Sequence, residues 1–195
     1  TKVGGHQIVY FDNAATTQRP LPVVNAVLDY TTHENGNPHR GAHIFAISAS
    51  EAYDTSKEVV RDFIHARSER EIIYTRNTSE SLNLVARSYG ETHLKAGDHI
   101  LITIAEHHSN LVTWQRVAQK TGAILDYIYV DKETGHFPEE ELKKIDDPRV
   151  KLFAFAEVSN VLGIDFDPKP LIQRAHAHGA IVVLDGAQST PHKSV

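Results

Sequence analysis

An apolar run near the end of the chain, Ile181-Val182-Val183-Leu184, stops abruptly at Asp185 and Gly186. A continuous apolar run of this length is typical of a strand that is buried on both faces, as strands in parallel sheets are. In open α/β sheets, ligands bind beyond the carboxyl ends of the strands. We therefore expect Asp185, and Gln188 shortly after it, at the functional edge of a parallel sheet.

Strand and helix patterns alternate along most of the chain. Expected strands cover residues 71–74, 98–104, 123–130, 151–158 and 180–184, and expected helices between them cover residues 79–89, 110–121, 138–145 and 168–178. Gly90 is expected to stop the first of these helices. Nearer the start, we expect a short strand at residues 8–11 and helices at residues 22–32 and 48–66. This alternation predicts an α/β fold, a three-layer sandwich with a mostly parallel sheet and helices on both faces.

Composition limits the possible classes of protein. The 195 residues are 41% hydrophobic and 23% charged, which suits a soluble globular protein with a core. Lys and Arg total 20 against 25 Asp and Glu, a net charge of −5 with no basic stripe, so no nucleic-acid partner is expected. No membrane span and no signal peptide are apparent, so we expect no membrane partner and a cytoplasmic location. The absence of cysteine rules out disulfides and a thiol nucleophile within these residues.

Polar residues follow several of the expected strands. Thr78 and Ser79 are candidate N-caps that place hydroxyls beside free helix N–H groups, which is a suitable arrangement for phosphate, although it also fits a plain helix cap. His107 could stack on a flat ligand, and its pairing with His108 could instead be an ordinary surface pair or a metal site. Asn110 is a candidate cap for the helix that follows.

The remaining candidates have equally plain alternatives. Asn160 could bind a ligand or serve only in a turn, and Asp185 could be a ligand or a cap. His39-Arg40-Gly41 could bring charge into a cleft or form a solvated loop. Together, the candidates place a phosphate cradle, an imidazole, an amide and a carboxylate at one sheet edge. Pyridoxal phosphate would use all four, with an Asp keeping its ring nitrogen protonated so that the ring acts as an electron sink.

Six motifs in order resemble those of the class V aminotransferase family of fold-type I pyridoxal-phosphate enzymes, and within it the cysteine desulfurases of the SufS type. The resemblance runs from Tyr10 to His192. The motifs are Phe11-Asp12-Asn13-Ala14-Ala15, His39-Arg40-Gly41, residues 76–83, Glu106-His107-His108-Ser109-Asn110, residues 158–163 and Asp185-Gly186-Ala187-Gln188.

The resemblance implies a role for each candidate. Thr78 and Ser79 would bind the cofactor phosphate, and His107 would stack on the ring and relay protons. Asn160 would contact the ring-hydroxyl region, Asp185 the ring nitrogen and Gln188 the phenolic oxygen. His39 and Arg40 would border the site, near a dimer interface. No metal is implied. Asn77 stands where the family usually has Gly, and Thr113 replaces a usual Pro.

The resemblance also implies that the chain is the front part of an enzyme. We expect an N-terminal segment at residues 1–20 and a pyridoxal-phosphate-binding large domain at residues 21–195, incomplete because the Schiff-base lysine, the persulfide cysteine and the small C-terminal domain of the family lie further on. Lys193 lacks the neighbours of that lysine.

The expected activity is that of a cysteine desulfurase, which converts L-cysteine to L-alanine and passes the sulfur to an enzyme persulfide for iron–sulfur cluster assembly. A homodimer and a sulfur-acceptor protein are the implied partners. Alternatives are another class V enzyme, such as a selenocysteine lyase or an aminotransferase, and a catalytically silent cofactor-binding or interaction fragment. The chain alone is expected to be inactive.

Overall fold

The computed structural model describes all residues, 1–195. Contacts divide the chain into two compact units, residues 1–73 with 194–195 and residues 74–193. No helix in either unit is long and apolar enough to cross a membrane. The division falls after residue 73, whereas the sequence places its boundary at residue 20; that boundary stays a prediction.

The first unit is built from a hairpin and two long helices. Strands β1 (Lys2–Val3) and β2 (His6–Gln7) pair antiparallel around Gly4 and Gly5. Helix α1 (Leu21–Asp29) continues as a π-helical segment, η1 (Tyr30–Glu34), and α2 (Ile44–Phe63) is followed by a 3-10 turn, η2 (Glu69–Glu71).

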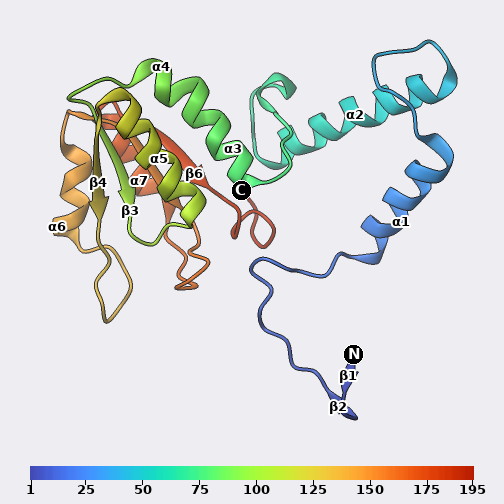
Figure 1. Cartoon of the computed structure of the whole chain (residues 1–195), viewed down its shortest axis with the longest axis horizontal. Coiled ribbons are helices and arrows are strands. Elements are labelled where there is room, and N and C mark those ends of the chain that lie inside the picture. Colours follow the sequence, from blue (N-terminus) through green and yellow to red (C-terminus); the bar gives the residue numbers. More distant parts are fainter. The chain divides into compact units, whose positions relative to one another are not determined.

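The second unit contains a parallel sheet in the order β4-β3-β5-β6, of which β3, β4 and β6 are labelled in Figure 1. Its strands are β3 (His99–Thr103), β4 (Ile124–Ile128), β5 (Val150–Ala156) and β6 (Ile181–Asp185). Its helical segments are α3 (Thr78–Val85), η3 (Ala86–Gly90), α4 (Glu91–His93), α5 (His108–Thr121), α6 (Glu139–Leu142), η4 (Lys143–Asp146) and α7 (Pro168–Ala177).

Alternate residues of the central strands pack against helices on opposite faces of the sheet. On one face, Ile100 and Leu152 belong to a buried cluster with Trp114 of α5. On the other face, Phe153 belongs to a cluster with Leu171 of α7. The predicted three-layer α/β sandwich with a parallel sheet is therefore confirmed.

Two expected strands and one expected helix end are wrong. Residues 69–71 form a 3-10 turn because Ser68 Oγ accepts the N–H of Arg70, so the strand at residues 71–74 does not form. The N-terminal pairing lies at residues 2–7 rather than 8–11. Gly90 does not stop a helix: its φ is −56°, and a Cβ there would lie 3.2 Å from Val117. Gly90 thus allows a close approach to α5.

Helix α5 ends at a glycine that the left-handed backbone requires. Gly122 has φ +76°, and a Cβ built on it would lie 3.2 Å from the Cβ of Ala96. Gly179, which follows α7, has φ +80° with nothing within 4 Å. The two sites share the same backbone strain but differ in the space around them.

We expect Gly122→Ala to lower the free energy of unfolding by more than Gly179→Ala does. Strain in the left-handed region costs each variant about 1 kcal/mol, and only Gly122→Ala adds crowding against a neighbour. Urea denaturation of both variants and the parent protein measures the difference. Equal losses for the two variants would show that the contact with Ala96 relaxes freely.

Candidate functional site

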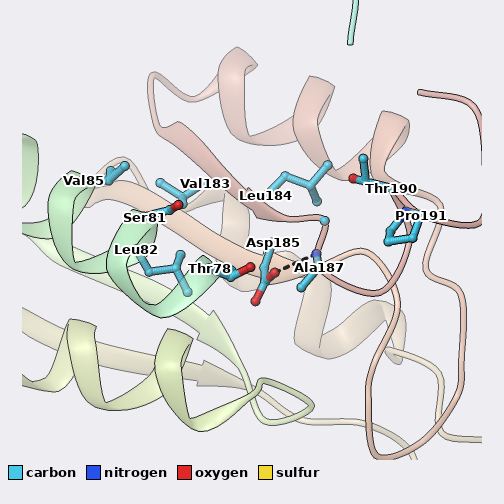
Figure 2. A pocket seen from close by; sticks show the side chains of 11 residues that line it. Thr78, Ser81, Leu82, Val85, Val183, Leu184, Asp185, Ala187, Thr190 and Pro191 are labelled. Atoms are coloured by element: carbon cyan, nitrogen blue, oxygen red, sulfur yellow. Dashed lines mark hydrogen bonds between the residues drawn. The ribbon is translucent and has the colours of Figure 1, made fainter. Parts of the chain in front are cut away.

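The loops that follow β3 and β5 diverge at the carboxyl edge of the sheet. The loop after β3 leads to α5 on one face, and the loop after β5 leads to α7 on the other face. A crevice at such a point, where the strand order reverses, is the usual ligand site of an open α/β sheet. The candidates from the sequence follow β3, β5 and β6, and the N-terminus of α3 lies beside the end of β6 (Figure 2).

Helix α3 begins at Thr78, and its cap is Asn77 rather than Thr78 or Ser79. Asn77 Oδ1 accepts the N–H of Glu80 at 3.0 Å, which corrects the expected cap. Because Asn and Asp compete well with hydroxyl residues as caps, the sequence did not separate these possibilities. The cap leaves the hydroxyls of Thr78 and Ser79 on the first turn, where helix N–H groups have no partner within the helix and favour an anion.

Asp185 lies at the end of β6 and is 6% exposed. Its Oδ1 accepts the N–H of Ala187 at 3.0 Å. A cavity of about 410 Å³ opens between α3 and the end of β6, with Thr78 and Asp185 at its polar end and Leu82 and Val183 along its apolar wall (Figure 2). The cavity therefore pairs a buried carboxylate with a helix N-terminus, and its volume lies in the range of small-molecule sites.

A chain of hydrogen bonds joins Ser79 to His107. The hydroxyls of Ser79 and Ser109 are 2.5 Å apart, and Ser109 Oγ lies 2.9 Å from His107 Nδ1. His107 is the cap of α5, since its Nδ1 accepts the N–H of Ser109, so the expected cap at Asn110 is wrong. His107 is an exposed residue, and its ring lies edge to face with the ring of His108 at 6.1 Å.

Asn160 and Gln188 follow β5 and β6 at the same edge. The loop that carries Asn160 is held by Ser159, whose Oγ donates to the carbonyl of Ala105 at 3.1 Å. Asn160 is exposed, whereas Gln188 is partly buried in the turn after Asp185. Their contacts with a ligand stay predictions.

His39 and Arg40 belong to the first unit. His39 has a left-handed backbone, φ 59°, and its N–H donates to Ser50 Oγ at 2.8 Å. Its ring lies 5.8 Å from the ring of Tyr53, edge to face, and Nε2 lies 3.4 Å from Asp54. These contacts hold the His39 ring against α2, and the proposed place of both residues at the border of the site stays a prediction.

Sequence reasoning missed Glu106 and its contacts. The carboxyl of Glu106 is 9% exposed and accepts hydrogen bonds from Thr103 Oγ, from Asn110 Nδ2 at 2.6 Å and from the N–H of Ala156 at 3.1 Å. Asn110, fully buried, accepts from Trp114 Nε1 at 2.8 Å. The spacing of four between residues 106, 110 and 114 could have signalled this, because residues 110 and 114 share a face of α5 and residue 106 lies one turn before them, just outside the helix.

Burial raises the pKa of Glu106 to about 7, and the charge of Asp185 adds to this effect, while the three hydrogen bonds oppose it. The structure holds no group of three or more His, Cys, Asp or Glu side chains that could bind a metal ion.

The raised pKa makes the stability of the fold depend on pH. In the unfolded chain Glu106 ionises near its ordinary value of 4.5, whereas the folded protein keeps the proton to about pH 7. Its contribution to stability is thus fully present below about pH 4.5 and is lost as the pH rises through about 7.

We expect the difference in unfolding free energy between the parent and Glu106→Gln to fall by about 2–3 kcal/mol between about pH 5 and about pH 8. The fall arises because only the parent carries the titrating group. Urea denaturation of both proteins at a series of pH values measures it. A difference that stays constant over this range would contradict a raised pKa.

Comparisons with known proteins identify the family of the chain. The profile described as aminotransferase class-V matches residues 9–195. A probable cysteine desulfurase of Synechocystis sp. is 46% identical over 191 residues, covering 98% of this chain and 45% of that protein. A second, from Halalkalibacterium halodurans, is 45% identical, covering 100% of this chain and 48% of that protein.

Solved structures show the same relationship. The apo structure of cysteine desulfurase from Thermococcus onnurineus NA1 is 43% identical with a TM-score of 0.90, covering 96% of this chain and 46% of that chain. The chain thus spans just under half the length of these relatives. Since the family profile matches nearly the whole chain, the chain belongs to the aminotransferase class-V family.

Proposed function

We propose that this chain forms the cofactor-binding front part of a pyridoxal-phosphate-dependent cysteine desulfurase. The observation that carries the proposal is the cavity that joins Thr78, at the N-terminus of α3, to the buried carboxylate of Asp185. The similar proteins named cysteine desulfurase support the choice of reaction. The complete protein would act on L-cysteine as a homodimer and pass sulfur to an acceptor protein for iron–sulfur cluster assembly.

The polar groups of the cavity and of the first turn of α3 fit pyridoxal phosphate. The hydroxyls of Thr78 and Ser79 and the first-turn N–H groups of α3 would bind the phosphate, because a helix N-terminus favours an anion. Asp185 would accept a hydrogen bond from the protonated ring nitrogen. When bound, the cofactor supplies an electron sink in its protonated pyridine ring.

The other candidates would orient and shield the ring. His107, exposed at the start of α5 and bonded to Ser109, would stack on the ring and hold or move a proton through its imidazole. Asn160 and Gln188 would donate to the oxygen substituent of the ring. Arg40 and His39 would border the site on the substrate side. Each residue thus binds, orients or carries a proton, and the chemistry belongs to the cofactor.

We expect Asp185→Ala to lower turnover of L-cysteine by the full-length protein at least about 100-fold, because the ring nitrogen loses its only proposed carboxylate partner. Release of alanine and sulfide measures turnover. Glu140→Gln, which changes an exposed carboxylate paired with Lys143, serves as the matched control and should act as the parent. Turnover by Asp185→Ala within threefold of the parent would refute the role.

The same assay separates this function from its rivals. Amino-group transfer to a keto acid in place of alanine release would favour an aminotransferase, and turnover of selenocysteine but not cysteine would favour a selenocysteine lyase. Failure of the full-length protein to bind pyridoxal phosphate would leave only an interaction role.

We expect Thr78→Val to weaken binding of pyridoxal phosphate to the full-length apoprotein by about 10- to 100-fold, because a hydrogen bond to a charged phosphate is lost at nearly constant shape. Quenching of protein fluorescence on addition of the cofactor measures the dissociation constant. Thr92→Val is the matched control, since that exposed hydroxyl bonds only to Ser88, Tyr89 and His93 of its own helical turns. Unchanged affinity in Thr78→Val would remove this residue from the phosphate site.

Lys193 is expected to stay unmodified when the loaded protein is treated with borohydride. Its ammonium lies 2.8 Å from Glu157 and 2.9 Å from Asp165, and these carboxylates raise the pKa of Lys193. A protonated amine is not a nucleophile, so it should form no reducible adduct with the cofactor aldehyde. Peptide mapping by mass spectrometry detects the adduct, and specific labelling of Lys193 would contradict this expectation.

A further inference from the structure

One buried carboxyl group has no part in the proposed contacts with the cofactor. Glu106 lies in the crevice between the ends of β3 and β5, and it lines an apolar cavity of about 150 Å³ with Ile104, Val161 and Leu162. Burying a carboxyl group beside apolar side chains is costly unless its hydrogen bonds are made. The hydrogen bonds of Glu106 therefore indicate what the group does.

Trp114 determines which atoms donate and which accept in these hydrogen bonds. Trp114 Nε1 can only donate, so the atom of Asn110 that faces it must be the amide oxygen. The amide nitrogen of Asn110 then faces Glu106, and Oε2 of Glu106 must accept. Its other oxygen, Oε1, accepts from the N–H of Ala156. A group at position 106 must therefore offer an acceptor in both directions.

These bonds lead directly to Asp185. Ala156, the last residue of β5, lies opposite Asp185 in the parallel register. Its neighbour Glu157 donates its N–H to the carbonyl of Asp185 at 3.1 Å. The end of β5 is thus held by Glu106 on one side and holds Asp185 on the other.

The same turn also holds the loop of Asn160. The carbonyl of Ala105, next to Glu106, accepts from Ser159 Oγ, and Ser159 Oγ in turn lies 3.4 Å from the N–H of Val161. Asn160 lies between these two anchored residues. The turn at residues 105–106 therefore ties together the two strand ends that carry Asn160 and Asp185.

We propose that Glu106 is a positioning residue: through Ala156 and β5 it fixes Asp185, and with Ala105 it fixes the loop of Asn160, at the edge that binds the cofactor. The identity of the cofactor in this inference rests on the proposed function. The hydrogen bonds that join the strand ends do not depend on it. Among the titratable groups, Asp185 on β6 acts on Glu106 through its charge, and His107 and His108 follow Glu106 in the chain.

Two variants separate the hydrogen bonds from the bulk of the side chain. Glu106→Gln keeps the shape but places an NH₂ group against a donor, either Asn110 Nδ2 or the N–H of Ala156. The double variant Glu106→Gln with Asn110→Asp reverses the polarity of that one contact. Gln then donates to Asp, Asp still accepts from Trp114, and the amide oxygen of Gln still accepts from Ala156, so every hydrogen bond is restored.

The first measurement needs no cofactor. In the full-length apoprotein, we expect the N–H groups of Ala156 and Glu157 to exchange with deuterium at least about tenfold faster in Glu106→Gln, because one buried donor is left unsatisfied. The double variant should return to within about threefold of the parent, and the amide of Ile128 at the sheet edge should not change. Parent-like exchange in Glu106→Gln, or no recovery in the double variant, would overturn the proposal.

The second measurement uses protein saturated with ¹⁵N-labelled pyridoxal phosphate. The nitrogen chemical shift reports protonation of the ring in loaded, folded protein, so a change in stability alone does not move it. We expect the ring nitrogen to lose its proton about one pH unit lower in Glu106→Gln, because Asp185 is misplaced, and to recover in the double variant. A titration identical to that of the parent overturns the proposal. If the parent binds no cofactor, the proposed function fails, and amide exchange alone decides on Glu106.

Discussion

The site depends on one constraint: the loops after β3 and β5 diverge to opposite faces of the sheet. Adjacent parallel strands send their helices, α5 and α7, to opposite faces of the sheet, so the two loops diverge and leave a crevice. The backbone pairing of β3 with β5 ends at Ile102 and Ala154 and does not continue into that crevice. The strand ends must therefore be held by side chains, and Glu106 and Ser159 supply the bonds that cross the gap.

Joining the strand ends through Glu106 requires the burial of an ionisable carboxyl group, which is energetically costly. An apolar residue at position 106 would leave the N–H of Ala156 and the amide of Asn110 unsatisfied, and a buried donor without a partner is destabilising. A carboxyl group satisfies both but resists ionisation, as its pKa of about 7 shows.

The sequence predicted the layers better than the details of the site. The apolar runs of β3 and β5 identify buried parallel strands. The run of β6 also forms a parallel strand, but its expected burial on both faces is wrong, because β6 lies at the edge of the sheet and Leu184 is 37% exposed. The expected strand at residues 71–74 failed because Ser68 forms a local 3-10 turn, a contact that apolar periodicity does not report. Gly90 was misread as a helix stop because its reason for being glycine is the nearby α5, which only the tertiary structure reveals.

The motif Glu106-His107-His108-Ser109-Asn110 shows why a site is harder to predict than a fold. Its residues serve two environments. His107 is exposed and linked through Ser109 to Ser79, whereas Glu106 and Asn110, at the two ends of the motif, are buried beside Trp114. Sequence patterns draw attention to the residues with familiar chemistry, here the histidines. The buried pair determines where the exposed residues stand, because α5 starts from a turn anchored to β5. The motif therefore contains both exposed candidate binding residues and the buried residues that position them.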